Sequence, residues 1–377
     1  MTTAGSDPMS TVNAEVTDLT AAAYTIPTDS PEGDGTLSWD TTTLIVVTAR
    51  CGGVTGTGWS YGSAAAVQVV ADLLAAQVLG RSALDVTACF DVMVKAVRNT
   101  GRSGIAGQAI SAVDVALWDL KARLLGLPLH RLLSAVRETV PVYGSGGFTT
   151  YQDDQLRRQL TEWTEDLGIP RVKIKIGELW GSHMARDVSR IRQARKLIGD
   201  DCELYVDANG GYTAKQAVRM MREAADCNVI WLEEPVSSDD LSGLGAVREA
   251  VDADVAAGEY GYDLTYFRRM CEAGAVDCLQ ADATRCGGIT EWLRVAAVAA
   301  AHNLQISAHC APYLHAHVGA CVPNLRHLEW FHDHTRIALR FFEGAAPPVG
   351  GVLRLSPDNP GHGLTLRDSD IETHRVA

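Results

Sequence analysis

Residues 203–259 contain three short apolar segments, ELYVDAN (203–209), VIWLEEP (229–235) and DVAAGE (254–259), with helical patterns between them. Each segment has the length of a strand, and each brings a carboxylate to its end: Asp207, Glu233 and Glu259. The three carboxylates follow one another at equal intervals along the chain. Strands that alternate with helices in this way predict a parallel sheet covered by helices.

The same alternation extends in both directions. Further apolar segments of strand length are VPVYGS (140–145), RVKIKIG (171–177), CLQAD (278–282), QISAH (305–309) and RHLEWF (326–331). Eight strands with intervening helices predict an α/β fold, a modified (β/α) barrel of the TIM type, over residues 139–342.

Two flanking regions complete the predicted organisation. Residues 1–138 contain a β-branched run at 42–50, glycine-rich turns and three helical patterns, the clearest over Ile105–Leu125, so we predict an N-terminal α+β capping domain. Residues 343–377 are rich in Gly and Pro. We predict that this C-terminal segment packs outside the barrel, on the capping domain.

Composition narrows the class of partner. The 377 residues have a formal net charge of −13, which disfavours nucleic acid and anionic membranes and favours a small molecule held by a local cation. Met1–Ser10 has neither the basic nor the apolar region of a signal peptide. Nine Cys without a Cys-x-x-Cys motif are typical of reduced, structural thiols, so we predict a cytoplasmic protein.

Charged and polar side chains gather where the predicted strands end. In a (β/α) barrel the carboxyl ends of the strands surround one site, so these side chains face a common mouth. Strand alternation also places the two lysines of VKIK on one face. The residues at the strand ends are Lys173, Lys175, Asp207, Asn209, Glu233, Glu259, Asp282, His309 and Glu329.

Three of these residues form a candidate metal site. Asp207, Glu233 and Glu259 supply hard oxygen ligands from three successive strands, which is the set that Mg²⁺ prefers, completed by water and substrate oxygens. Zn²⁺ prefers His or Cys ligands. The pairs His315/His317 and His332/His334 are a rival zinc motif, which we interpret as ordinary surface histidines because no paired Cys accompanies them.

A site of this kind can remove a proton next to a carboxylate. The proton is very weakly acidic, and a divalent ion on the carboxylate oxygens stabilises the enediolate that forms. We expect Lys175 to act as a neutral base, with its pKa lowered by Lys173 and Mg²⁺. His309 with Asp282 forms a second acid/base pair, and Glu329 can hydrogen-bond the substrate carboxylate.

The motifs together resemble the enolase superfamily, and within it the mandelate racemase-like subgroup. The matching segments are VDVALWDLKARLLGLP (113–128), VKIKIG (172–177), VDANGGY (206–212), WLEEP (231–235), GE (258–259), ADATRCGGITEW (281–292), SAH (307–309) and HLEW (327–330). The resemblance implies Lys175 and the His309–Asp282 pair as bases and Glu329 as an electrophilic partner. It also implies substrate contacts by Lys173 and Asn209, a ligand set that leaves out Glu234, and a homo-oligomer.

The reaction itself is less determined than the site. We expect the capping loops Thr20–Gly35 and Cys51–Ser60 to close the site, and the first is polar and acidic. With Asn209, this loop favours an acid-sugar dehydratase that converts an aldonate or aldarate to a 2-keto-3-deoxy acid. The alternatives are a racemase or epimerase of a 2-hydroxy acid and a cycloisomerase. A non-catalytic binding barrel is disfavoured, because no base or ligand position has been lost.

Overall fold

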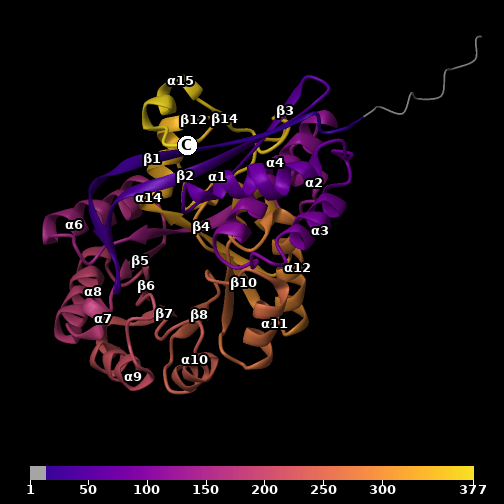
Figure 1. Ribbon diagram of the computed structural model, residues 1–377. Helices are drawn as coiled ribbons and strands as arrows, with labels where there is room; N and C mark the ends of the chain where they lie inside the picture. Colours follow the sequence, from indigo (N-terminus) through magenta and orange to yellow (C-terminus); the bar gives the residue numbers. More distant parts are fainter. Residues whose placement is uncertain (1–13) are drawn as a thin grey trace, which may run out of the picture.

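The computed structural model describes residues 14–377, and the segment Met1–Ser10 considered above lies outside them. Eight parallel strands form a ring in chain order, and the ring is closed because β11 pairs with β4 (Figure 1). The prediction of a (β/α) barrel is therefore confirmed. The strands are β4 (Thr139–Gly146), β5 (Arg171–Lys175), β6 (Glu203–Asp207), β7 (Val229–Glu233), β8 (Asp254–Ala257), β9 (Cys278–Ala281), β10 (Gln305–Ala308) and β11 (Leu325–Phe331).

Helices surround the ring and bury its outer face. Outward positions such as Val172, Ile174 and Leu232 are apolar and fully buried in one continuous core. The alternating inward positions are mostly aromatic, charged or polar. The outer helices are α6 (Asp153–Thr161), α8 (Met184–Ile198), α9 (Ala214–Glu223), α10 (Leu241–Arg248), α11 (Leu264–Glu272), α12 (Gly288–Ala301), α13 (Pro312–Gly319) and α14 (His332–Phe341), and short helices α5 (Leu129–Leu132) and α7 (Glu178–Gly181) lie in the connections.

An aromatic layer fills the lower part of the ring. The rings of Tyr205 and Trp231 stack with centroids 5.5 Å apart, and Tyr143 meets His327 edge-on at 4.7 Å. These four side chains are almost completely buried. The layer excludes water beneath the strand ends, so charges placed directly above it lie in a low-dielectric environment.

The cap consists of the antiparallel sheet β1 (Asp18–Gly33), β2 (Ser38–Cys51) and β3 (Val54–Tyr61), followed by α1 (Ala65–Val69), α2 (Ala75–Val78), α3 (Val86–Ala96) and α4 (Ile105–Leu124). The expectation that Thr20–Gly35 and Cys51–Ser60 are loops was wrong. Most of both segments lies in β1 and β3, because they find pairing partners on the two sides of β2. In Figure 1 the indigo strands β1 and β2 cross the molecule above the barrel.

The turn between β1 and β2 rests on the barrel mouth. The Asp34 carboxylate accepts hydrogen bonds from the backbone N–H groups of Thr36 and Leu37, at 2.6 and 2.8 Å, which fixes the turn. At Gly35, a Cβ atom would lie 2.6 Å from the carbonyl oxygens of Ile176 and Ala208. Only glycine allows the turn to approach the ends of β5 and β6 this closely.

The C-terminal part of the chain contacts both regions. Strand β13 (Val352–Arg354) pairs antiparallel with the start of β4, and β12 (Phe342–Glu343) pairs with β14 (Thr365–Leu366), which precedes the short helix α15 (Asp368–Ile371). Beyond α15, the N–H of Val376 donates to the carbonyl of Ala23 in β1. Among residues 14–377, no helix is both long and apolar enough to cross a membrane.

Helix α4 attaches the cap to the barrel through α12. The buried carboxylate of Asp114 accepts hydrogen bonds from the N–H of Thr290 at 3.0 Å and from its hydroxyl at 2.6 Å. A carboxylate at the first turn of a helix is favoured by the helix dipole. Burial nevertheless raises the pKa of Asp114 to about 7, with the Thr290 bonds opposing it.

Asp114→Asn should flatten the dependence of stability on pH. In the unfolded chain Asp114 ionises near pH 4, whereas in the folded protein it stays protonated until about pH 7. Its contribution to the free energy of unfolding is present below pH 4 and is lost as the pH rises towards 7. Urea unfolding at pH 5.0 and 7.5 measures this loss, which should be smaller in the variant. The exposed Asp252→Asn is the control, and an unchanged slope in Asp114→Asn would contradict the assignment.

Candidate functional site

A cavity of about 310 Å³ lies between the cap and the strand ends. Four of the nine predicted site residues line it: Lys175, Asn209, Glu259 and His309. The other five lie beneath or behind these four and are nearly or fully buried. The cap contributes Asp34, Trp39, Thr41, Thr42, Thr43, Tyr61, Gly62 and Gln108.

The three predicted metal ligands come together. One carboxylate oxygen from each of Asp207, Glu233 and Glu259 lies within 4.8 Å of the others, and all three residues are buried. Glu259 Oε2 has no hydrogen-bond partner within the described part of the chain. Three hard oxygens and an orphaned buried carboxylate oxygen fit Mg²⁺, which binds few protein carboxylates and keeps waters or substrate oxygens.

The ammonium of Lys173 lies among carboxylates and does not line the cavity. It forms ion pairs with Glu233 and, at 2.8 Å, with Glu329. Asp207 lies 3.4 Å from the same nitrogen. Burial alone would lower the pKa of Lys173, but Glu233 and Glu329 outweigh burial and raise it well above its usual value.

Lys175 lines the cavity directly. Its Nζ lies 2.5 Å from Asp207 Oδ2. The expectation that Lys173 and Mg²⁺ together lower its pKa stays a prediction. Burial and the charge of Lys173 do lower the pKa of Lys175, but the Asp207 carboxylate outweighs them and raises it. Sequence alone did not reveal the ion pair between Lys175 and Asp207, because the pairing of β5 with β6 sets the register that brings them together.

His309 and Asp282 form the expected pair. His309 Nδ1 lies 2.8 Å from Asp282 Oδ2, so Nδ1 donates and Nε2 faces the cavity. The other oxygen, Asp282 Oδ1, accepts from the N–H and hydroxyl of Thr284 at 2.6 and 2.7 Å. Burial opposes ionisation of Asp282, but the bond to His309 prevails and lowers its pKa. The imidazole is therefore held in one tautomer by an ionised carboxylate.

Glu329 is fixed on three sides. Its Oε1 accepts from the Ser145 hydroxyl at 2.6 Å and pairs with Lys173, and its Oε2 accepts from the N–H of Cys310 at 2.7 Å. Burial opposes ionisation, but Lys173 and then His309 keep the pKa of Glu329 well below its usual value. The carboxylate lies 3.9 Å from His309 Nε2, at the floor of the cavity.

Asn209 and Glu234 follow their strands in the left-handed backbone region, with φ of 46° and 39°. Asn209 lines the cavity, and its side-chain Oδ1 is buried without a partner in the described residues. Glu234 is fully buried, and burial followed by the charge of Glu259 raises its pKa well above the usual value. It lies outside the group formed by the three predicted ligands.

Residues that the sequence did not single out complete the site. Arg285 Nη1 donates to Glu259 Oε1 at 3.2 Å, and its Nε lies 3.6 Å from Asp282. Cys310 Sγ lies 3.2 Å from His309 Nε2. Arg285 lies within the motif ADATRCGGITEW, and Cys310 directly follows SAH. This proximity to predicted site residues was the signal in the sequence that could have identified them. Gln280 and Trp231 hold Glu233 from below through N–H donors at 3.2 and 2.8 Å.

Among the described residues, no two of the four histidines of the rival zinc motif belong to the same group of potential metal ligands. His315 accepts from the N–H of Ala283 at 2.9 Å, and His334 stacks on Tyr61 with centroids 3.5 Å apart. His332 pairs with Asp29 across the cap boundary. Three of the four are buried, so their interpretation as surface histidines was wrong. Groups that cover them, such as Ala283 at His315 and Tyr61 at His334, lie far away in the sequence.

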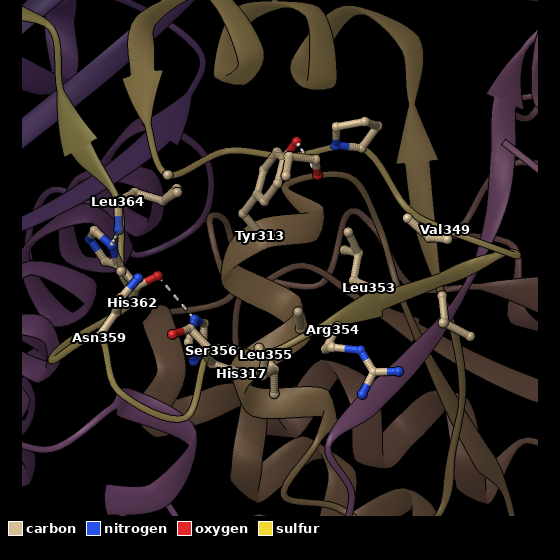
Figure 2. A pocket seen from close by; sticks show the side chains of 16 residues that line it. Tyr313, His317, Val349, Leu353, Arg354, Leu355, Ser356, Asn359, His362 and Leu364 are labelled. Atoms are coloured by element: carbon tan, nitrogen blue, oxygen red, sulfur yellow. Dashed lines mark hydrogen bonds between the residues drawn. The ribbon is translucent and has the colours of Figure 1, made fainter.

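His317 lines a second cavity, of about 410 Å³, under the C-terminal segment. Figure 2 shows His317, Tyr313 and His362 around it, with Leu353 and Leu355. Burial, together with His362, lowers the pKa of His317 to about 3, so this imidazole is neutral. The lining contains no carboxylate side chain, and none of the predicted site residues belongs to it.

The chain matches two family models and several known proteins. Residues 155–370 match the family model described as enolase C-terminal domain-like, and residues 21–134 match that of the mandelate racemase/muconate lactonizing enzyme N-terminal domain. L-Talarate/galactarate dehydratase of Salmonella typhimurium is 37% identical over 288 residues, 74% of this chain and 71% of that protein. Its crystal structure liganded with Mg and L-lyxarohydroxamate superposes with a TM-score of 0.89, at 29% identity, over 100% of this chain and 97% of that one.

Two further proteins are similar over most of their length. The 3,6-anhydro-α-L-galactonate cycloisomerase of Streptomyces coelicolor is 33% identical over 320 residues, 83% of this chain and 86% of that protein. The structure of a mandelate racemase/muconate lactonizing enzyme-like protein from Rubrobacter xylanophilus is 47% identical. It has a TM-score of 0.91 and covers 96% of this chain and 100% of that one.

Glu259→Gln should weaken Mg²⁺ binding about tenfold or more, because it removes one anionic ligand. It is the least disruptive of the three possible changes, since Glu259 makes no contact with the buried ammonium of Lys173. Calorimetric titration of the chelator-treated protein with Mg²⁺ gives the affinity. The exposed Glu249→Gln should bind Mg²⁺ like the wild type, and wild-type affinity in Glu259→Gln would refute the ligand assignment.

Proposed function

Because the chain belongs to the mandelate racemase/muconate lactonizing enzyme family of the enolase superfamily, we propose that it is an acid-sugar dehydratase. It would convert an aldonate or aldarate to a 2-keto-3-deoxy acid. The observation that carries this proposal is that Lys175 and the His309–Asp282 pair face one cavity whose cap wall is rich in hydroxyl and amide groups. Such a wall suits a polyhydroxylated chain, because each sugar hydroxyl needs a hydrogen-bond partner when it leaves water.

Asp207, Glu233 and Glu259 are the proposed ligands of Mg²⁺. Bound there, Mg²⁺ would supply positive charge next to the substrate carboxylate oxygens, where negative charge develops as the α-proton leaves. The chain's own side chains would position the ligands. Trp231 and Gln280 hold Glu233 from below, and Arg285 holds Glu259 from the side.

Two groups can move protons in the cavity. Lys175 ends the second strand of the ring, and His309 follows the seventh, so the two side chains enter from separate parts of the ring. We propose that one of them removes the α-proton and that His309 donates a proton to the departing β-hydroxyl. The carboxylate of Asp282 supports this role, because it stabilises the imidazolium and keeps Nε2 directed at the substrate.

The remaining predicted residues are proposed to bind substrate. Glu329 would hydrogen-bond the substrate carboxylate from the floor of the cavity. Lys173 would contact the same carboxylate, although its ammonium now lies on Glu233 and Glu329. Asn209 offers a buried amide oxygen without a partner in the described residues, which suits a substrate hydroxyl donor.

Three further predictions remain proposals. We propose that the chain assembles as a homo-oligomer and that it acts in the cytoplasm on a small carboxylate. We also retain the division into a capping domain (1–138), a barrel (139–342) and a C-terminal segment (343–377). The contacts of β13 with β4 and of Val376 with Ala23 support the placement of the last segment against both other parts.

A panel of aldonates and aldarates, incubated with the protein and Mg²⁺, should include at least one acid that yields a 2-keto-3-deoxy product. The keto acid is detected by semicarbazide absorbance and by the loss of one water in mass spectrometry. The Lys175→Ala/His309→Asn double variant is the negative control. Formation of an epimer alone would favour a racemase. Lactones and anhydro sugars are incubated separately, and their ring opening without loss of water would favour a cycloisomerase.

Single variants should separate the two bases through solvent deuterium exchange. If Lys175 removes the α-proton, His309→Asn should keep exchange at the α-carbon and lose turnover, whereas Lys175→Ala should lose both. If His309 removes the proton, the pattern is reversed. Asp282→Asn should lower kcat by about 10²–10⁴-fold with little change in KM, because the imidazole loses its fixed tautomer. Wild-type turnover in Lys175→Ala or His309→Asn would refute the two-base site.

A further inference from the structure

A second group of ligand-type side chains lies at the boundary between the cap and the barrel. Asp29 and Glu32 belong to β1, and His332 begins α14. One potential ligand atom from each residue lies within 4.8 Å of the other two. His332 Nε2 lies 3.1 Å from Asp29 Oδ2. The group shares no residue with the three carboxylates at the barrel mouth.

Glu32 is the unusual member of this group. Its side chain is completely buried, and Oε2 accepts a hydrogen bond from Trp39 Nε1 at 3.0 Å. Its other oxygen, Oε1, is buried with no partner anywhere in the described chain. The neighbouring Asp333 is also fully buried, and although its Oδ1 pairs with Arg336 at 2.5 Å, its Oδ2 has no described partner either.

These carboxylates outnumber their basic partners. Asp29, Glu32 and Asp333 stand together, and Arg336 and His332 are the basic groups that pair with them. Burying a carboxylate without a counter-ion costs several kcal/mol. Burial, followed by the charge of Asp333, raises the pKa of Glu32 to about 9. A proton on Glu32 relieves this cost, and so does a bound cation.

We propose that Asp29, Glu32 and His332 form a binding site for a divalent transition-metal ion such as Zn²⁺. The donor set of one imidazole nitrogen and two carboxylate oxygens is one that Zn²⁺ binds well and that Mg²⁺ and Ca²⁺ do not favour. Asp29 is half-exposed and His332 is partly exposed, so the site is open to solvent on one side. An ion can enter from there and keep one water ligand.

An ion at this site ties the cap to the barrel. Its ligands come from β1 of the cap and from α14, which directly follows strand β11. Trp39, which donates to Glu32, also lines the catalytic cavity. The ion would therefore hold the hairpin that forms one wall of that cavity. Its role is structural, and it does not depend on which acid the protein converts.

Zinc titration of the chelator-treated full-length protein tests the proposal. The wild type should bind two Zn²⁺ ions, more tightly at Asp29, Glu32 and His332 than at the barrel mouth, where every protein ligand is a carboxylate. Glu32→Gln and His332→Asn should each lose one ion, with an affinity drop of about tenfold or more. Asp207→Asn should lose the other ion and keep this one. Calorimetry gives the stoichiometry, and metal analysis after gel filtration checks it.

The matched control is His302→Asn, the same change at an exposed histidine on the barrel surface, which should bind two ions. Zn²⁺ should also raise the melting temperature of Asp207→Asn, but not of Asp207→Asn/Glu32→Gln. Melting in EDTA confirms that the variants fold. If Glu32→Gln does not fold, His332→Asn provides the test. The proposal is overturned if Glu32→Gln and His332→Asn keep the wild-type stoichiometry, or if the wild type binds one ion that Asp207→Asn abolishes.

Discussion

The ammonium of Lys173 lies above the aromatic layer of the barrel, where it contacts Glu233 and Glu329 and approaches Asp207. Three carboxylates cannot share a dry space unless a positive charge offsets their repulsion. Lys173 provides that charge from within the fold, so the carboxylates are positioned before any ligand arrives. The geometry of the site therefore depends on the inward orientation of one lysine on β5, which strand alternation fixes.

The barrel was predictable because its strands are buried on both sides. Apolar residues occupy the outward positions of the strands, and each of the eight predicted segments overlaps a strand of the ring. The cap hairpin was harder. Strand β1, with the sequence DLTAAAYTIPTDSPEG, contains two prolines and several alanines, which are poor strand formers. Its pairing with the β-branched strand β2 overrides that local preference, and this pairing is a tertiary interaction that no local pattern contains.

The site, like the fold, was predictable from the sequence in part. The ends of parallel strands meet at one edge, so Asp207, Glu233 and Glu259 could be grouped from topology alone. Distances within the group could not be read from the sequence, and neither could the ion pair between Lys175 and Asp207, which depends on the register of β5 and β6. His315 and His334 were interpreted as surface residues because the sequence does not show which segments cover them. The groups that bury them come from distant parts of the chain.

The pairing of β11 with β4 has a consequence for synthesis. Phe331 must reach Ser145 before the ring closes, and β4 leaves the ribosome long before β11 is made. Until then the nascent sheet has an open edge on β4 and another on whichever strand emerged last. Exposed edges of this kind recruit other strands and lead to aggregation. The nascent barrel is therefore exposed to aggregation until the eighth strand of the ring has left the exit tunnel.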